Sequence, residues 1–292
     1  MPTLERDVET LIQPMTEERT APSKWVQYAR AFAGLFLRDL HVLRREIFPF
    51  IIRVCMNPLL FLFVFTYIMP HMNGGAAMNP TAGMAGANFS TVLLPGLMAV
   101  AIMFSGIAAV ALPLAQEFGI TREIDDRVMC PLPVSAVAIE KICFSALQSM
   151  IAAAVVFPLA YFVPATPVYA HVNSWGFLIL VLVLASLTSG ALGLVIGTSV
   201  KPQQIGLIFG VVVMPITFLG CVYYPWEALK YIRWLKIGVL INPIVYMSEG
   251  LRAALTPKLE HMPQLVIVAM LAGFLVLLTS LGIKGFLRRV IG

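Results

Sequence analysis

Charged residues are missing from four long windows of the chain, and these windows predict how it crosses a membrane. No Asp, Glu, Lys or Arg occurs in the windows 54–116, 142–200, 202–226 and 262–283. A membrane-spanning helix needs roughly 20 consecutive apolar residues. The first two windows are long enough for two spans and a short loop each, and the last two hold one span each. The pattern therefore predicts an all-α integral membrane protein with six transmembrane helices, at about 48–70, 91–115, 142–163, 175–199, 204–223 and 263–283.

Upstream of the first span, the pattern changes from irregular to helical. Residues 1–22 are polar and acid-rich, so we expect a disordered tail. Over 23–46, apolar residues such as Trp25 and Phe32 recur at three- and four-residue steps, and the basic residues fall largely on the other side. This pattern predicts an amphipathic interface helix on the membrane surface, with a core-facing soluble helix as the alternative. Its candidate interface residues are Trp25, Arg30, Arg38, Arg44 and Arg45.

Composition agrees with a membrane protein and gives no sign of a metal or redox centre. The chain is 59% hydrophobic and 12% charged, whereas soluble domains are nearer 25% charged. Its four cysteines have no CxxC spacing, and its four histidines are isolated from one another. We expect the cysteines to be small buried apolar residues, so no metal site is predicted.

The distribution of Lys and Arg predicts the orientation. Basic residues gather before the first span, in the 117–141 loop and after the last span, while the 71–90 and 164–174 loops carry none. The positive-inside rule then places both termini in the cytoplasm, in a multi-pass protein of the cytoplasmic membrane. The segment 225–262 opposes this orientation, because it would lie outside with five Lys or Arg residues.

Arg53 lies about one turn inside the first predicted span. An ionisable group at membrane depth is expensive, which makes a functional role one interpretation. The other interpretation is that the side chain snorkels to the headgroups.

The loop after the second span is dense in charges of both signs. Ile120, Ile124 and Val128 recur at four-residue spacing within it, and Pro131 and Pro133 follow. This predicts a short cytoplasmic helix with one apolar stripe available to a partner. Its other side chains are expected to be exposed charges.

The segment 223–252 is too polar to span a bilayer cleanly and too apolar to be a solvated loop. Within it, residues 237–241 and 243–247 are expected to be buried. Glu249 and Arg252 are three residues apart, so they share one helical face. They are either an ion pair in a water-poor site or a solvated surface pair.

No motif for catalysis is present in the sequence. It contains no GxxxxGK[ST], HExxH or GxSxG pattern and no paired intramembrane carboxylates, so no catalytic residue is predicted. The long spans also lack the Asp, Glu or His that ion-coupled carriers usually hold at membrane depth.

Three stretches resemble the membrane subunit of a type-2 ATP-binding-cassette (ABC) exporter, the family of drug-resistance, nodulation-factor and polysaccharide exporters. The first is LLPGLMAVAIMFSG at 93–106, and the second is Glu117 and Gly119 followed by PLPVS at 131–135. The third is the segment after the fifth span, where the matching residues are Pro215, Phe218, Gly220, Tyr224, Pro225, Trp234, Asn242, Pro243, Tyr246, Glu249, Leu251 and Arg252. One departure is that a proline common shortly before the tryptophan is absent.

The resemblance implies a permease domain over 47–292 that works as a homodimer with two copies of a separate ATPase chain. This chain would hold no cofactor, and Mg-ATP would be bound and hydrolysed by the partner. A coupling helix over 117–130 would dock on the ATPase through Glu117, Arg122, Glu123, Ile124, Asp125, Asp126 and Arg127. An extracellular re-entrant helical hairpin before the last span would form the outer gate, with Tyr224, Pro225, Trp234, Asn242, Pro243, Tyr246, Glu249 and Arg252 as its candidate residues.

Sequence and resemblance together predict a subunit of an ATP-driven exporter that moves an amphipathic compound, a lipid or a glycan outward. No nucleic acid is expected among its partners. The alternatives are an ion-coupled secondary carrier and a non-transporting membrane scaffold.

Overall fold

The computed structural model describes residues 23–68, 71, 89–121, 132–163 and 171–291, and every regular element in these ranges is helical. The long helices are α2 (Lys24–Arg45), α3 (Ile47–Leu62), α5 (Phe89–Gln116), α7 (Val134–Phe162), α8 (Trp175–Ser199) and α13 (Gln264–Ile291). Two π-helical turns extend long helices, η1 (Phe63–Ile68) after α3 and η2 (Glu117–Thr121) after α5. The shorter elements are η3 (Pro202–Gln204), α9 (Ile205–Ile208), η4 (Phe209–Val213), α10 (Met214–Phe218), η5 (Trp226–Tyr231), α11 (Arg233–Gly238), η6 (Val239–Ile241) and α12 (Pro243–Leu255).

Five helical stretches of the described chain are long and apolar enough to cross a membrane. They are Ile47–Phe65, Ser90–Gly119, Val134–Ala160, Trp175–Ser199 and Gln264–Val290. These correspond to five of the six predicted spans, and the all-helical membrane fold is therefore confirmed. The helix predicted over 23–46 is also present as α2.

The predicted fifth span, 204–223, is wrong as one continuous helix. The apolar helix here runs from Ile205 to Phe218 and contains a π-helical turn. The chain then turns, and Cys221 has a positive φ of 52°, which no helix tolerates. The turn places the carbonyl groups of residues 220–222 against other elements, as described below.

The helix of the predicted third span, 142–163, begins before the span does. α7 begins at Val134, directly after Pro133, whose extended backbone (ψ 138°) serves as the N-cap. Glu140 and Lys141 therefore lie inside the helix, and both are buried. Charges mark the edge of a bilayer in sequence, but they do not mark the end of a helix that continues beyond it.

α5 is the central helix and packs against α7, α8 and α12. Its contact with α8 is close because α8 places small residues there. A Cβ at Gly193 would lie only 2.9 Å from the Cα of Ile107 on α5. Small residues of this kind let membrane helices approach backbone to backbone.

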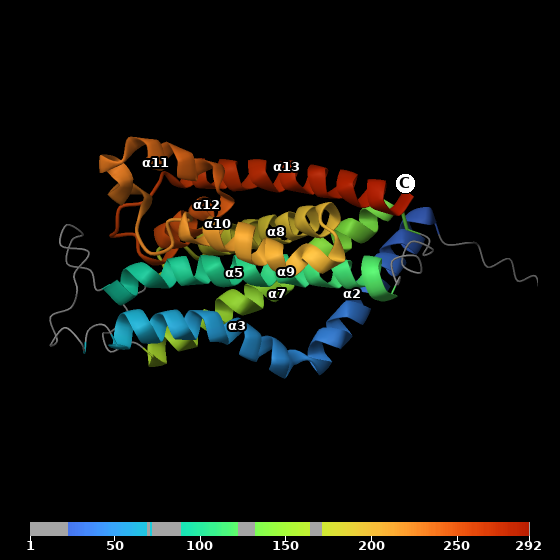
Figure 1. The fold of residues 1–292 in the computed structure, drawn as a ribbon, viewed down its shortest axis with the longest axis horizontal. Coiled ribbons are helices and arrows are strands. Elements are labelled where there is room, and N and C mark those ends of the chain that lie inside the picture. Colours follow the sequence, from blue (N-terminus) through green and yellow to red (C-terminus); the bar gives the residue numbers. More distant parts are fainter. Residues whose placement is uncertain (1–22, 69–70, 72–88, 122–131, 164–170, 292) are drawn as a thin grey trace, which may run out of the picture.

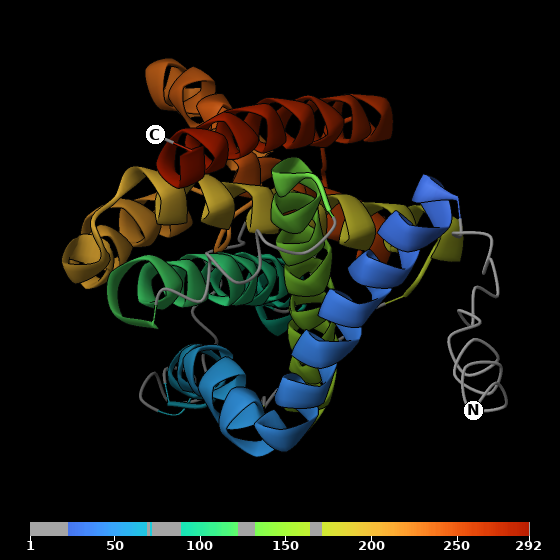
Figure 2. The same cartoon turned by 90° about the vertical axis from the view of Figure 1, so that its right-hand side faces the viewer.

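The two ends of the bundle carry different structures (Figure 1). α11 and α12 lie at one end, which we call the hairpin end. α2, η2 and the C-terminal end of α13 lie at the opposite end, which we call the α2 end. Viewed from the α2 end, α2 runs across the bundle at an angle and meets α3 in an elbow (Figure 2).

Candidate functional site

The segment after α10 forms a compact helical hairpin, made of η5, α11, η6 and α12. Pro225 precedes η5 with an extended backbone, and Pro243 is the first residue of α12. Proline suits both places, because the first turn of a helix does not need its N–H group. The short helices predicted for this segment are thus present.

Asn242 joins the start of α12 to the helix before the turn. Its side-chain oxygen accepts a hydrogen bond from the N–H of Ile244 (3.2 Å), which caps α12, and its Nδ2 donates to the carbonyl of Ile216 (2.6 Å). The Tyr246 hydroxyl donates to the carbonyl of Leu240 (2.9 Å). These predicted residues therefore hold the hairpin onto α10 and close its inner loop.

Glu249 and Arg252 form an ion pair at the centre of the hairpin, and the solvated alternative is wrong. Arg252 is 0% exposed and Glu249 is 1% exposed. The Arg252 guanidinium donates to Glu249 Oε1 and, through its other terminal nitrogen, to the carbonyl of Cys221 (3.2 Å). A buried ion pair is tolerable only when such additional hydrogen bonds satisfy its atoms.

The Glu249 carboxylate also binds two backbone groups that are distant in sequence. Its Oε1 accepts from the N–H of Trp226 (2.9 Å), and its Oε2 accepts from the N–H of Met262 (3.2 Å). With the Cys221 carbonyl, the pair joins α12 to the turn after α10, to the start of η5 and to the segment before α13. One carboxylate and one guanidinium thus organise the whole hairpin.

A second ion pair holds α11 against η5. Lys236 Nζ lies 2.9 Å from Glu227 Oε2 and 3.8 Å from the centre of the Trp226 ring, and the Trp226 indole N–H donates to the carbonyl of Lys236 (3.1 Å). Both charged side chains are partly exposed. This pair therefore contributes far less stability than the buried one.

Some of the remaining predicted hairpin residues are buried and others are exposed. Pro225 is buried and Tyr224 is half-buried, whereas Trp234 and Tyr231 project outward as exposed aromatic side chains. The expectation that 237–241 is buried holds for Val239, at 3% exposure, but is wrong for Ile237 and Ile241, which are 70% and 84% exposed. Residues 243–247 are buried as expected.

Gly96, in the LLPGLM stretch, allows the hairpin to rest on α5. A Cβ at this position would lie 1.9 Å from the carbonyl oxygen of Val222, so only glycine fits. The resemblance to type-2 exporters includes this stretch but implies no role for it. The structure gives the role, since the turn after α10 packs directly on the α5 backbone.

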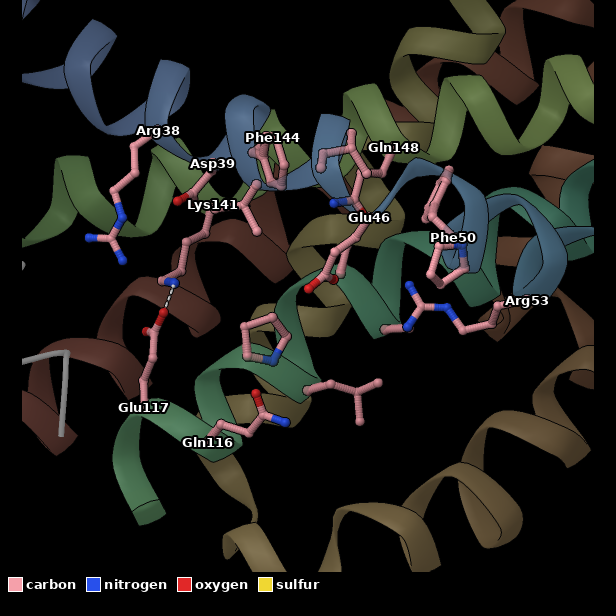
Figure 3. Close-up of a pocket in the computed structure, with 17 residues that line it drawn as sticks. Arg38, Asp39, Glu46, Phe50, Arg53, Gln116, Glu117, Lys141, Phe144 and Gln148 are labelled. Atoms are coloured by element: carbon pink, nitrogen blue, oxygen red, sulfur yellow. Dashed lines mark hydrogen bonds and ion pairs between the residues drawn. The ribbon is translucent and has the colours of Figure 1, made fainter. Parts of the chain in front are cut away.

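At the α2 end, Glu117 is not the exposed charge that was expected. It is 4% exposed, and its Oε1 accepts from Lys141 Nζ on α7 at 2.8 Å (Figure 3). The ion pair joins η2, the π-helical turn that follows α5, to α7. Lys141 was missed because it was assigned to the loop, although a cation just before an uncharged window could have suggested a partner for Glu117.

The other predicted coupling residues, 122–127, lie outside the described residues. The candidate interface residues Trp25, Arg30, Arg38, Arg44 and Arg45 are all exposed on α2. Arg38 also lines a cavity under the elbow of α2 and α3. Their location at a membrane surface stays a prediction.

Arg289, near the end of α13, is a residue that the sequence analysis missed. Its guanidinium donates to the carbonyls of Gly197 (3.0 Å), Thr198 (3.3 Å) and Val200 (2.9 Å), which are unpaired acceptors at the end of α8. It also lies 4.5 Å above the ring of Phe118 in η2. Arg289 thus connects α13, the end of α8 and η2.

Within the described ranges, no cluster of three or more His, Cys, Asp or Glu residues could hold a metal ion. Two buried ion pairs lie in this part of the chain, one at each end of the bundle, and Glu140 on α7 is buried as well. The two pairs hold helices in fixed relative positions.

Comparison with known proteins agrees with this arrangement. The model of the ABC-2 type transporter family matches residues 31–256, which include α5, α7, α8 and the hairpin through α12. A search of curated proteins gave no match. The matched domain is a multi-pass transmembrane component of ABC transporters, typically without catalytic activity, that associates with an ATP-binding-cassette ATPase. The chain therefore belongs to the ABC-2 type transporter family.

Proposed function

We propose that the chain is the membrane subunit of an exporter that moves an amphipathic compound, a lipid or a glycan outward across the cytoplasmic membrane. The observation that carries the proposal is the connection between the two ends of the bundle. α5 continues directly into η2, which carries Glu117 at the α2 end, and α5 contacts the hairpin at Gly96. One helix can therefore link an ATPase docked at the α2 end to a gate at the other.

Ion pairing lowers the net positive charge that an outward hairpin would carry. Five Lys or Arg residues in 225–262 opposed the positive-inside rule, but two of them are neutralised. Arg252 pairs with Glu249, and Lys236 pairs with Glu227. With the α2 end cytoplasmic, both termini lie in the cytoplasm and the hairpin lies outside.

The proposed complex contains two copies of this chain and two copies of the ATPase, which binds and hydrolyses Mg-ATP. Large apolar side chains on the α9–α10 segment support a homodimer, because Leu207 and Val211 are each more than 60% exposed. Lipid could cover some of this surface, but six spans alone form only half of a symmetric path. The mass of the intact complex after co-purification with the ATPase gives the stoichiometry, and an active complex with one permease would contradict it.

A secondary carrier is less well supported. The buried charges at Glu117, Lys141, Glu249 and Arg252 are paired near the two ends of the bundle. Ion-coupled carriers usually place ionisable groups near the bilayer midplane, where the coupling ion binds. A scaffold is also less well supported, because a gate-like hairpin held by a buried ion pair is unnecessary for anchoring.

The decisive experiment is transport in vesicles reconstituted with the permease and its ATPase. We expect export that needs ATP and stops with a hydrolysis-deficient ATPase variant. Transport that persists without the ATPase and collapses with a proton uncoupler would support a carrier. Unchanged ATP turnover on adding the permease would support a scaffold.

Charge reversal tests the coupling segment separately. Arg122→Glu combined with Arg127→Glu should uncouple ATP hydrolysis from export while membrane insertion stays normal. The matched control is Arg44→Glu combined with Arg45→Glu, which reverses two charges on α2. Normal export by the first variant together with lost export by the second would move the docking site to α2.

A further inference from the structure

A cavity of about 650 Å³ lies under the elbow of α2 and α3. α5 and α7 form its other walls (Figure 3). Its lining combines apolar side chains such as Phe50, Leu112 and Phe144 with six charged residues, three of each sign. A cavity of this size and mixed polarity is large enough for part of an amphipathic molecule.

Most of the charged residues in the cavity already have partners. Lys141 pairs with Glu117, and Arg38 and Asp39 are also engaged. Glu46 and Arg53 are different, because neither forms an ion pair with any residue in the described ranges. The guanidinium of Arg53 lies 5.9 Å from the centre of the Phe50 ring.

Glu46 and Arg53 extend into the same space from different depths (Figure 3). Glu46 is the N-cap of α3, directly before the apolar stretch Ile47–Phe65. Arg53 lies about two turns further along, roughly 10 Å into that stretch. An unpaired guanidinium at such a depth is costly, and a bound anion removes much of the cost. The direction of Arg53 toward the cavity favours a functional role over snorkelling.

The order of these charges matches a phospholipid with an amine in its headgroup. In a bilayer leaflet the ammonium lies at or beyond the level of the phosphate, and the acyl chains lie deepest. Glu46 at the membrane boundary suits the ammonium, and Arg53, deeper, suits the phosphate. The exposed apolar residues Phe48 and Ile52 on α3 offer a surface for the acyl chains.

We propose that this cavity binds the zwitterionic headgroup of an aminophospholipid, with the ammonium on Glu46 and the phosphate on Arg53. The proposal rests on the proposed function only in treating α3 as a membrane span. A primary ammonium donates hydrogen bonds to a carboxylate, whereas a choline group cannot. The site should therefore prefer phosphatidylethanolamine to phosphatidylcholine, and to phosphatidylglycerol, which has no cation for Glu46.

The test measures the lipid that stays bound to the purified permease. The protein is exchanged into nanodiscs with equal parts of the three phospholipids, extracted in mild detergent, and its retained lipid is quantified by mass spectrometry. The wild-type chain should retain phosphatidylethanolamine above the other two. Arg53→Gln should lower retention of all three about tenfold, as expected for loss of a charge-assisted hydrogen bond to phosphate.

Glu46→Gln gives the more discriminating result. It should retain phosphatidylglycerol as well as the wild type retains phosphatidylethanolamine, so the preference disappears while binding persists. Arg53→Lys should restore part of the retention, which shows that a folded protein was compared. The matched control is Arg44→Gln, an exposed cation on α2 outside the cavity, and it should leave retention unchanged. Equal retention by wild type, Arg53→Gln and Glu46→Gln would overturn the proposal.

Lipid retention requires neither ATP nor the ATPase. It can therefore be confirmed or refuted whatever the export assay shows. The same chemistry could come from a resident membrane lipid or from transported cargo. Headgroup-labelled phosphatidylethanolamine in the reconstituted vesicles distinguishes the two sources. ATP-dependent movement of the label that is lost in Arg53→Gln identifies cargo, and retention without movement identifies a resident lipid.

Discussion

Replacing Glu249 by alanine should open the hairpin, and the expected size of the effect follows from its contacts. The substitution leaves the Arg252 guanidinium buried without its carboxylate, and the N–H groups of Trp226 and Met262 lose their acceptor. Removing one partner of a buried ion pair costs about 3–5 kcal/mol. Since about 1.4 kcal/mol is a tenfold change in an equilibrium constant, the open hairpin should become about a hundredfold more populated or more.

Cys221 reports this opening directly, because it is 0% exposed and its carbonyl binds Arg252. The assay measures the rate at which a membrane-impermeant maleimide labels Cys221. The other three cysteines are first replaced by serine, at positions 55, 130 and 143. The Cys221 thiol reacts with the maleimide only when the hairpin is open. In the open state the thiol is equally solvated in every variant, so the labelling rate is proportional to the population of open hairpin. Glu249→Ala should label about a hundredfold faster than wild type. It should also export less and hydrolyse more ATP per molecule exported.

Three control variants test whether the unpaired Arg252 guanidinium causes the faster labelling. Glu249→Asp should recover part of the slow labelling, because a carboxylate is restored. The double variant Glu249→Leu/Arg252→Met should label more slowly than Glu249→Ala, because no charge is left unpaired. Glu227→Ala, in the partly exposed pair, should change labelling only about fivefold or less. If Glu249→Ala labelled no faster than Glu227→Ala, the reasoning about the buried pair would be refuted.

Two further substitutions test the contacts at either end of the bundle. Gly96→Ala should displace the turn at Val222 and lower the unfolding temperature of the purified protein. Gly176→Ala, which has open space around it, should leave that temperature unchanged. Equal unfolding temperatures of the two variants would refute the close contact at Gly96. Arg289→Gln should leave the carbonyl groups at the end of α8 without a donor and reduce the ATP turnover coupled to export. Replacing the exposed Arg288 by glutamine should not reduce it. Full activity of Arg289→Lys would show that a positive charge at this position is sufficient.

The spans could be predicted because a bilayer imposes a simple rule on sequence. Windows without charge must be long enough to cross it, and five of the six predicted spans are helices of that kind. The rule fails where a different constraint decides the structure. Lys141 was assigned to a loop, although its partner Glu117 allows it to be buried in α7.

The hairpin also has features that the sequence predicts and features that it does not predict. The three-residue spacing of Glu249 and Arg252 predicted that they could pair, because neighbours on a helix face are a local property. Their burial was not predictable, since it depends on Trp226, Met262 and Cys221, which contact them from distant parts of the chain. The fifth span was predicted too long for a related reason. Apolar residues continue past Phe218, but the backbone turns there to reach α5 and α12.

The positions of the two prolines in α5 have a mechanical consequence. Pro95 and Pro113 lie close to the two ends of this helix, and each removes one backbone hydrogen bond. Between them the helix is unbroken by proline and held closely against α8 at Gly193. α5 is therefore a stiff rod with a softer joint at each end. On the proposed function, a displacement at Glu117 would therefore move Gly96 as part of one rigid segment, without any chain of side-chain rearrangements between them.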